Sequence, residues 1–283
     1  MNRHFPEWLK VKAPRSYDVE KIKKLNIITI CEESKCPNRA ICYSKSVATF
    51  MILGKNCTRM CKYCNVIKNN ACSDESFDIE QILYAIEKLD LKHVVITSVT
   101  RDDLYDGGAE YFARLISVIK ENFCKITIEV LIPDFFGKEI FLKDVVLQSP
   151  DIIGHNIDIV KSLYPKIKPG ASYKRSINVL QKLKQLNESI FTKSFIMVGL
   201  GEKFKEIIAV MNDLKEAKCD ILMIGQYLRP GLSNLDVVEY VNPEIFRKYE
   251  LMAKKLKFKY IVSGPFVRSS YNSYEILNDL RIK

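Results

Sequence analysis

Apolar residues follow two alternating patterns between residues 47 and 264. Short runs that are apolar at nearly every position are typical of strands buried on both faces of a parallel sheet. Between these runs, apolar residues recur every three or four positions, which predicts amphipathic helices. The expected strands cover residues 47–54, 93–99, 125–132, 151–157, 191–200, 221–228 and 260–265, and the expected helices begin near residues 79, 108, 137, 173, 204 and 243.

These elements form six βα units in order, followed by a last short strand. Six units are too few for a complete eight-fold barrel, so an α/β fold with a partial (β/α)6 TIM-like barrel is expected. A doubly wound sheet stays open as an alternative, because strand order cannot be read from the sequence. We divide the chain into an N-terminal extension at 1–46, the barrel at 47–264 and a C-terminal extension at 265–283.

Composition narrows the class of protein. The chain has 283 residues, enough for one large domain or two small ones, and 47% of them are apolar and 28% charged. The N-terminal sequence MNRHFPEWLK lacks the apolar segment of a secretory signal, and no apolar run is long enough to cross a bilayer. We therefore expect a cytoplasmic protein that does not bind membranes. A net charge of +10 favours acidic partners, although basic residues spread over many segments also suit solvated helix faces.

Six of the nine cysteines lie within residues 31–64, in two triplets of different spacing. Clustered cysteines in a reducing compartment are more often metal ligands than disulfides. The upstream triplet is Cys31, Cys36 and Cys42 (C-x4-C-x5-C), and the downstream triplet is Cys57, Cys61 and Cys64 (C-x3-C-x2-C). The other three, Cys72, Cys124 and Cys219, are isolated, and we assign them no role.

The downstream triplet follows the first expected strand, and reactive groups in parallel α/β folds collect at the carboxyl ends of strands. Three thiolates on one loop can hold three irons of a four-iron, four-sulfur cluster and leave the fourth iron open. A structural zinc site would need four closed ligands. A thioredoxin-like redox pair would leave Cys57 unexplained. The spacing therefore favours an iron–sulfur cluster.

With aromatic Tyr63 before the last cysteine, the downstream triplet resembles the motif of the radical S-adenosylmethionine superfamily. The resemblance implies that the open iron binds the amino and carboxylate groups of S-adenosylmethionine. One electron from the cluster then cleaves a carbon–sulfur bond, and the 5′-deoxyadenosyl radical abstracts hydrogen from an unactivated C–H bond.

The upstream triplet suggests a second cluster of the 4Fe-4S type. Together with VVITSVTRDDLYDGGAEYFARLI at 94–116 and RSSY at 268–271, it makes residues 27 to about 275 similar to the lipoyl synthase family. That family inserts two sulfur atoms at C6 and C8 of a protein-bound octanoyl-lysyl group, with the auxiliary cluster as sulfur donor. The resemblance implies that the upstream triplet and a serine of RSSY hold this auxiliary cluster. We carry the role to Ser270, with Ser269 as the alternative.

The resemblance also implies partners. These are octanoylated lipoyl domains of 2-oxoacid dehydrogenase E2 subunits and glycine cleavage H protein, an electron donor such as ferredoxin or flavodoxin, and an iron–sulfur carrier for cluster repair. Nucleic acid is not expected. A second enzyme reading, a radical methylthiotransferase acting on tRNA, would suit the basic charge. It lacks support because no RNA-binding domain follows the barrel. A metal-stapled nucleic-acid-binding module without catalysis would not need a long βα series.

Polar residues near expected strand ends are candidates for binding S-adenosylmethionine. Thr97 and Ser98 end the second strand, and Asn156 ends the fourth. Glu129 lies on the third strand, and Arg175 opens a helix, where its guanidinium could pair with the methionyl carboxylate. The charged loop at 101–103 either binds substrate or shapes the loop, and His155 is expected to be a packed strand-end residue.

Overall fold

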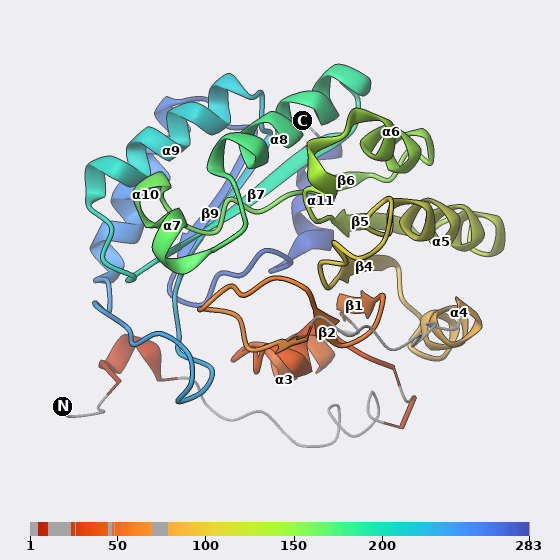
Figure 1. Ribbon diagram of the computed structural model, residues 1–283, viewed down its shortest axis with the longest axis horizontal. Helices are drawn as coiled ribbons and strands as arrows, with labels where there is room; N and C mark the ends of the chain where they lie inside the picture. Colours follow the sequence, from red (N-terminus) through yellow and green to blue (C-terminus); the bar gives the residue numbers. More distant parts are fainter. Residues whose placement is uncertain are drawn as a thin grey trace.

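The computed structural model describes residues 5–10, 24–25, 27–44, 47, 49–69 and 79–282 (Figure 1). Within them, a parallel seven-stranded sheet has the order β1-β4-β5-β6-β7-β8-β9. A short parallel pair, β2 (Asn56–Cys57) and β3 (Ile67–Lys68), flanks the downstream triplet. The main strands are β1 (Thr49–Ile52), β4 (His93–Ser98), β5 (Thr127–Leu131), β6 (Ile152–Gly154), β7 (Phe191–Val198), β8 (Ile221–Gln226) and β9 (Tyr260–Gly264).

The strand order decides between the two expected architectures. Each main strand pairs with the next one along the chain, and the order never reverses. A doubly wound sheet needs a reversal, so that alternative is wrong. The predicted partial barrel of six βα units and a last strand is confirmed.

The helices between the strands lie along the outer face of the sheet (Figure 1). Their apolar stripes are buried, as in α5, where Phe112, Leu115, Ile116 and Ile119 are inaccessible to solvent. These helices are α4 (Ile79–Lys88), α5 (Ala109–Asn122), α6 (Glu139–Leu147), α8 (Tyr173–Leu186), α9 (Phe204–Glu216) and α10 (Pro243–Lys255). Short helical segments are η1 (Glu7–Leu9), η2 (Phe135–Gly137), η3 (Lys161–Leu163) and α7 (Tyr164–Ile167).

Both extensions pack against the barrel. The N-terminal one contributes α2 (Ile30–Glu33) and α3 (Arg39–Ser44), and its Thr29 forms an antiparallel bridge to Phe50 of β1. The C-terminal helix α11 (Ser273–Ile282) buries Ile276 and Leu277 in one apolar cluster with strand residues such as Phe195. None of the helices in the described ranges is sufficiently long and apolar to span a membrane.

Several expected strands end earlier than the apolar runs suggested, and two of these ends bear on the site. Strand β1 stops at Ile52, because Leu53 and Gly54 have φ of 64° and 88°. Strand β6 stops at Gly154. His155 and Asn156 therefore lie in the loop at the carboxyl end of the sheet, where they can face a ligand.

Candidate active site

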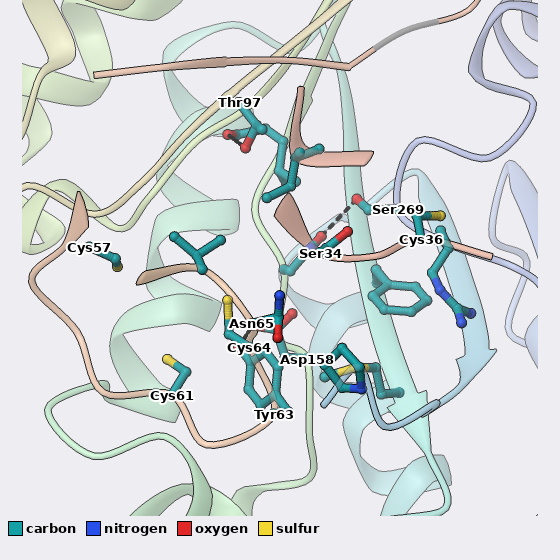
Figure 2. A pocket seen from close by; sticks show the side chains of 18 of the residues that line it. Ser34, Cys36, Cys57, Cys61, Tyr63, Cys64, Asn65, Thr97, Asp158 and Ser269 are labelled. Carbon is teal, nitrogen blue, oxygen red and sulfur yellow. Dashed lines mark hydrogen bonds between the residues drawn. The ribbon is translucent and has the colours of Figure 1, made fainter. Parts of the chain in front are cut away.

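A cavity of about 530 Å³ opens at the carboxyl ends of the strands. Figure 2 shows Cys57, Cys61 and Cys64 on one side of it and Cys36 with Ser269 on the other. The barrel and both extensions thus contribute to one space. Of the predicted site residues, the cavity is lined by Cys31, Cys36, Cys57, Cys61, Cys64, Thr97, Ser98, Asn156, Ser269 and Ser270.

Three predicted residues do not line this cavity. Cys42 lies on α3, a short distance along the chain from the other two cysteines of its triplet. Glu129 is fully buried in an ion pair with Lys193. Arg175 donates a hydrogen bond to Asp134 Oδ2 at 3.2 Å. Glu129 and Arg175 thus have protein partners that can explain their charge.

The charged loop after β4 anchors the downstream triplet. Backbone N–H and Oγ1 of Thr58 each donate a hydrogen bond to the Thr100 carbonyl at 3.0 Å. Thr58 Oγ1 in turn accepts from the backbone N–H of Asp102 at 3.0 Å. The segment between Cys57 and Cys61 is therefore attached to the end of β4 by three hydrogen bonds.

Arg59 extends this attachment to a second strand end. Its guanidinium donates two hydrogen bonds to Asp102, at 2.8 and 2.9 Å, and two to Asp134, at 2.9 and 2.6 Å. Burial opposes the charge on Arg59, but hydrogen bonds to both carboxylates raise its pKa above the ordinary value. Likewise, burial would raise the pKa of Asp134, yet Arg59 lowers it to about 2. The planar guanidinium suits this two-sided pairing.

The other half of the loop is attached to β6 and β8. Tyr63 Oη and Lys168 Nζ both donate to Asp158 Oδ2, at 2.7 and 2.6 Å. Asn234, in the loop after β8, donates to the carbonyls of Lys62 and Cys64 at 3.3 and 2.8 Å. Contacts from four strand ends thus fix the path of the downstream triplet.

The downstream thiols are half-buried at the edge of the cavity. Burial, together with the neighbouring thiols, raises the pKa of Cys64 to about 11. Burial also raises the pKa of Cys61, while the nearby Lys168 lowers it. Among the described residues, no three cysteine, histidine or acidic side chains converge on one point as a single-ion site requires. A four-iron cluster fits this donor set better, because each thiolate binds a different iron.

The upstream triplet joins the two extensions. Burial and, to a lesser extent, the nearby Cys36 raise the pKa of Cys31 to about 11. The Asn38 amide donates a hydrogen bond to the Phe266 carbonyl at 2.6 Å. Two residues further on, Arg268 lies close enough to Cys36 for their charges to interact. The upstream triplet and the RSSY motif therefore lie together, as two parts of one cluster site would.

The two serines of RSSY have different partners. Ser269 Oγ donates to Asn156 Oδ1 at 3.0 Å, a bond drawn in Figure 2. Ser270 Oγ instead accepts from Thr49 Oγ1 at 3.0 Å. Thr49 also hydrogen-bonds to Cys31. Ser270 is therefore linked through Thr49 to the upstream triplet, whereas Ser269 is linked to the end of β6.

Two lining residues carry buried polar atoms that have no hydrogen-bond partner within the described parts of the chain, Ser98 Oγ and His155 Nε2. His155 Nδ1 lies 3.0 Å from the Ile132 carbonyl, so Nδ1 carries the proton and donates. Burial lowers the pKa of His155 to about 4, which leaves Nε2 as an acceptor at neutral pH. Both atoms can accept or exchange hydrogen bonds with a bound polar ligand such as S-adenosylmethionine.

Sequence reasoning assigned no role to several residues that shape this site. Arg59 lies inside C-x3-C, and Asp134, Asp158 and Lys168 lie in loops after strands. The sequence signal that could have identified these residues was their position, either inside the downstream cysteine motif or in a loop that follows a strand. For the loop at 101–103, the structure favours the shaping role over the binding of substrate, since Asp102 pairs with Arg59 and Asp103 with Arg101.

Comparison with known proteins agrees with the fold and the cysteine loop. The model of the radical SAM superfamily matches residues 51–214. Two solved structures share the fold. Methylornithine synthase matches with a TM-score of 0.58 and 13% identity, over 94% of this chain and 92% of that one. The hydrogenase maturase HydG matches with a TM-score of 0.61 and 14% identity, over 88% of this chain and 63% of that one. The chain is a member of the radical SAM superfamily.

Curated relatives identify the family to which the chain belongs within this superfamily. A lipoyl synthase of Caldicellulosiruptor bescii is 47% identical, over 98% of this chain and 97% of the relative. Those of Caldanaerobacter subterraneus and Aquifex aeolicus are each 46% identical, over 95% and 92% of this chain and 95% of each relative. This chain belongs to the lipoyl synthase family.

Proposed function

We propose that this chain inserts two sulfur atoms into a protein-bound octanoyl-lysyl group, at C6 and C8, and so forms the lipoyl cofactor. The observation that carries the proposal is that both cysteine triplets lie at a single cavity, with Cys31 and Cys36 of the upstream one among its lining residues. A radical formed at one triplet can then act on a substrate held beside the other. Family membership supports the same reaction and does not favour the tRNA methylthiotransferase.

The cofactors are two 4Fe-4S clusters and S-adenosylmethionine. Bound at the open iron, S-adenosylmethionine supplies the 5′-deoxyadenosyl radical that removes hydrogen from carbon. Cys57, Cys61 and Cys64 hold that cluster, and Arg59 and Asp158 fix their loop. We assign S-adenosylmethionine contacts to the cavity residues Thr97, Ser98 and Asn156, and add His155 Nε2 as an acceptor.

Glu129 and Arg175 serve the site indirectly in this proposal. Glu129 pairs with Lys193 and accepts from Ser273 at the start of α11. Arg175 supports Asp134, which in turn holds Arg59. Arg175 thus positions residues that line the cavity, whereas Glu129 fixes the start of α11.

The auxiliary cluster is proposed to bind Cys31, Cys36, Cys42 and Ser270. Ser270 is favoured over Ser269 because Thr49 connects it to Cys31. In this proposal, the described parts of the extensions 1–46 and 265–283 contribute ligands to a site at the barrel 47–264.

The wall of the cavity suits an alkyl substrate. Val99, Leu131, Phe195 and Met197 contribute apolar surface to the cavity that both triplets reach. Such a lining would hold an octanoyl chain and keep water from a carbon radical. Conversion would require the chain to lie with C6 and C8 facing the upstream triplet.

The substrates are octanoylated lipoyl domains, and we propose those of 2-oxoacid dehydrogenase E2 subunits and glycine cleavage H protein. Ferredoxin or flavodoxin is the proposed electron donor, and an iron–sulfur carrier rebuilds the auxiliary cluster. The proposed location is the cytoplasm, where thiols stay reduced.

An anaerobic assay tests the reaction. Cluster-loaded protein is mixed with an octanoyl-lysyl peptide, S-adenosylmethionine and a reductant, and the peptide is analysed by mass spectrometry. We expect a product in which two hydrogens are replaced by two sulfurs, together with 5′-deoxyadenosine. A peptide that stays unmodified while 5′-deoxyadenosine accumulates would contradict the proposed substrate.

A further inference from the structure

Thr49 lies between residues that reach the cavity from opposite ends of the chain. It belongs to β1 and is 2% exposed. Its hydroxyl donates to Ser270 Oγ at 3.0 Å. Its backbone N–H also hydrogen-bonds to Cys31, which partly offsets the effect of burial on the pKa of that thiol. Thr49 thus contacts one proposed ligand from each extension.

The two adjacent serines differ in what their hydrogen bonds leave available. The single proton of the Ser269 hydroxyl is directed to Asn156 Oδ1. Turning Ser269 toward the upstream triplet would break this bond. Ser270 Oγ accepts a hydrogen bond from Thr49 and keeps a further lone pair for a metal. The hydrogen-bond pattern therefore distinguishes two serines that the sequence could not.

We propose that the Thr49 hydroxyl selects Ser270 as the oxygen ligand of the auxiliary cluster and weakens the hold of that oxygen on its iron. The inference rests on the proposed function, because it assumes a cluster at the upstream triplet. A hydrogen bond donated to a coordinating oxygen draws electron density away from the metal, and such contacts tune metal sites. Iron–sulfur clusters already favour thiolates over oxygen. The Ser270-bound iron is thus the one released first.

The test measures iron release from full-length protein loaded anaerobically with iron and sulfide. A ferrous chelator is added, and the fastest phase of release is timed. Thr49→Val keeps the shape of the side chain and removes the hydroxyl, so the fastest phase should slow roughly three- to tenfold, the effect of one neutral hydrogen bond. Thr49→Ser restores a donor and should release iron at nearly the original rate. The Mössbauer signal of the oxygen-bound iron should shift in Thr49→Val and return in Thr49→Ser.

Thr192→Val is the matched control. Thr192 is also buried on a strand, β7, and its hydroxyl bonds to Asp220 at 3.2 Å, but it does not line the cavity. Loss of this hydroxyl should leave iron release unchanged. Release from Thr49→Val at the original rate or faster would overturn the proposal.

Two further variants separate the possible failures. If Thr49→Val binds no auxiliary cluster, adding Ser270→Cys should restore it, because a thiolate needs no help from Thr49. A cluster that does not return would overturn the inference. Ser270→Ala tests the ligand itself: an unchanged fast phase would refute the Ser270 assignment. A changed phase in Ser270→Ala, with none in Thr49→Val, would refute only the role of Thr49.

Discussion

Lys193 and Glu129 form an ion pair in which both side chains are completely buried beneath the cavity. Ser273, the first residue of α11, donates to the same Glu129 carboxylate and also contacts His93 Nε2 at 3.0 Å. Burial lowers the pKa of His93 to about 3, so it remains neutral. The pair therefore fixes the start of α11, three residues after Ser270.

Breaking this pair should destabilise the fold strongly. Glu129→Gln leaves Lys193 buried without an anion and should lower the free energy of unfolding by about 3–5 kcal/mol. Urea unfolding of the metal-free chain measures the loss. The exposed pair Lys218 and Glu188 provides the control, since Glu188→Gln should cost less than about 1 kcal/mol. Equal effects of the two changes would show that the buried pair has no special role.

Cys61→Ala should remove the cluster of the downstream triplet and abolish 5′-deoxyadenosine formation, because no iron would remain to bind S-adenosylmethionine. The barrel should still fold, since its core does not depend on this loop. Iron content and chromatographic detection of 5′-deoxyadenosine measure the result. Cys124→Ala changes an exposed, isolated cysteine and should behave like the original protein. Reductive cleavage that persists in Cys61→Ala would refute the assignment.

Cys36→Ala should separate the two chemistries. Formation of 5′-deoxyadenosine should continue, whereas sulfur insertion should stop, because the variant lacks a ligand of the sulfur-donating cluster. Both products can be followed in the same anaerobic reaction by mass spectrometry. Loss of both activities together would instead indicate that the two triplets hold one shared site.

Periodicity predicted the barrel because its strands are buried on both faces and its helices on one, and both kinds of burial leave a pattern in the sequence. Strand order leaves none, so the partial barrel had to be separated from a doubly wound sheet by the observed pairing. The cysteine triplets were visible because their ligands lie close together along the chain.

Residues whose roles depend on distant partners could not be placed in this way. Glu129 accepts a hydrogen bond from Ser273, which is 144 positions away. Arg59 meets Asp134 across 75 positions. His155 was expected to be packed, and it is buried, but only the structure shows that Nε2 lacks a partner in the described residues. Such pairings depend on the folded topology and have no local signature.

Charge should matter for recognition of the whole partner. With a net charge of +10, the chain should attract an acidic lipoyl domain, and salt screens such attraction. Association with an octanoylated domain, measured by surface plasmon resonance, should weaken as salt rises through the physiological range. Binding of a short octanoyl-lysyl peptide should change much less. Equal salt responses would reject electrostatic steering and leave the chemistry untouched.

Arg59 should control how accurately the downstream triplet is placed. Arg59→Lys keeps the positive charge but cannot form the paired hydrogen bonds to both Asp102 and Asp134. The cluster should still assemble, because all three thiols remain. The rate of 5′-deoxyadenosine formation should fall by up to about a hundredfold, since small displacements of reacting groups are costly.

Lys62→Gln is the matched control, because Lys62 lies in the same loop, its side chain is exposed, and the loop is held there by backbone groups. It should retain the original rate. Iron content, the rate with saturating S-adenosylmethionine and KM are measured for both variants. A fall in rate at unchanged iron content indicates misplacement of the cluster, whereas a loss of iron indicates failed assembly. Full activity in Arg59→Lys would mean that the backbone bonds of Thr58 to Thr100 are sufficient to hold the loop.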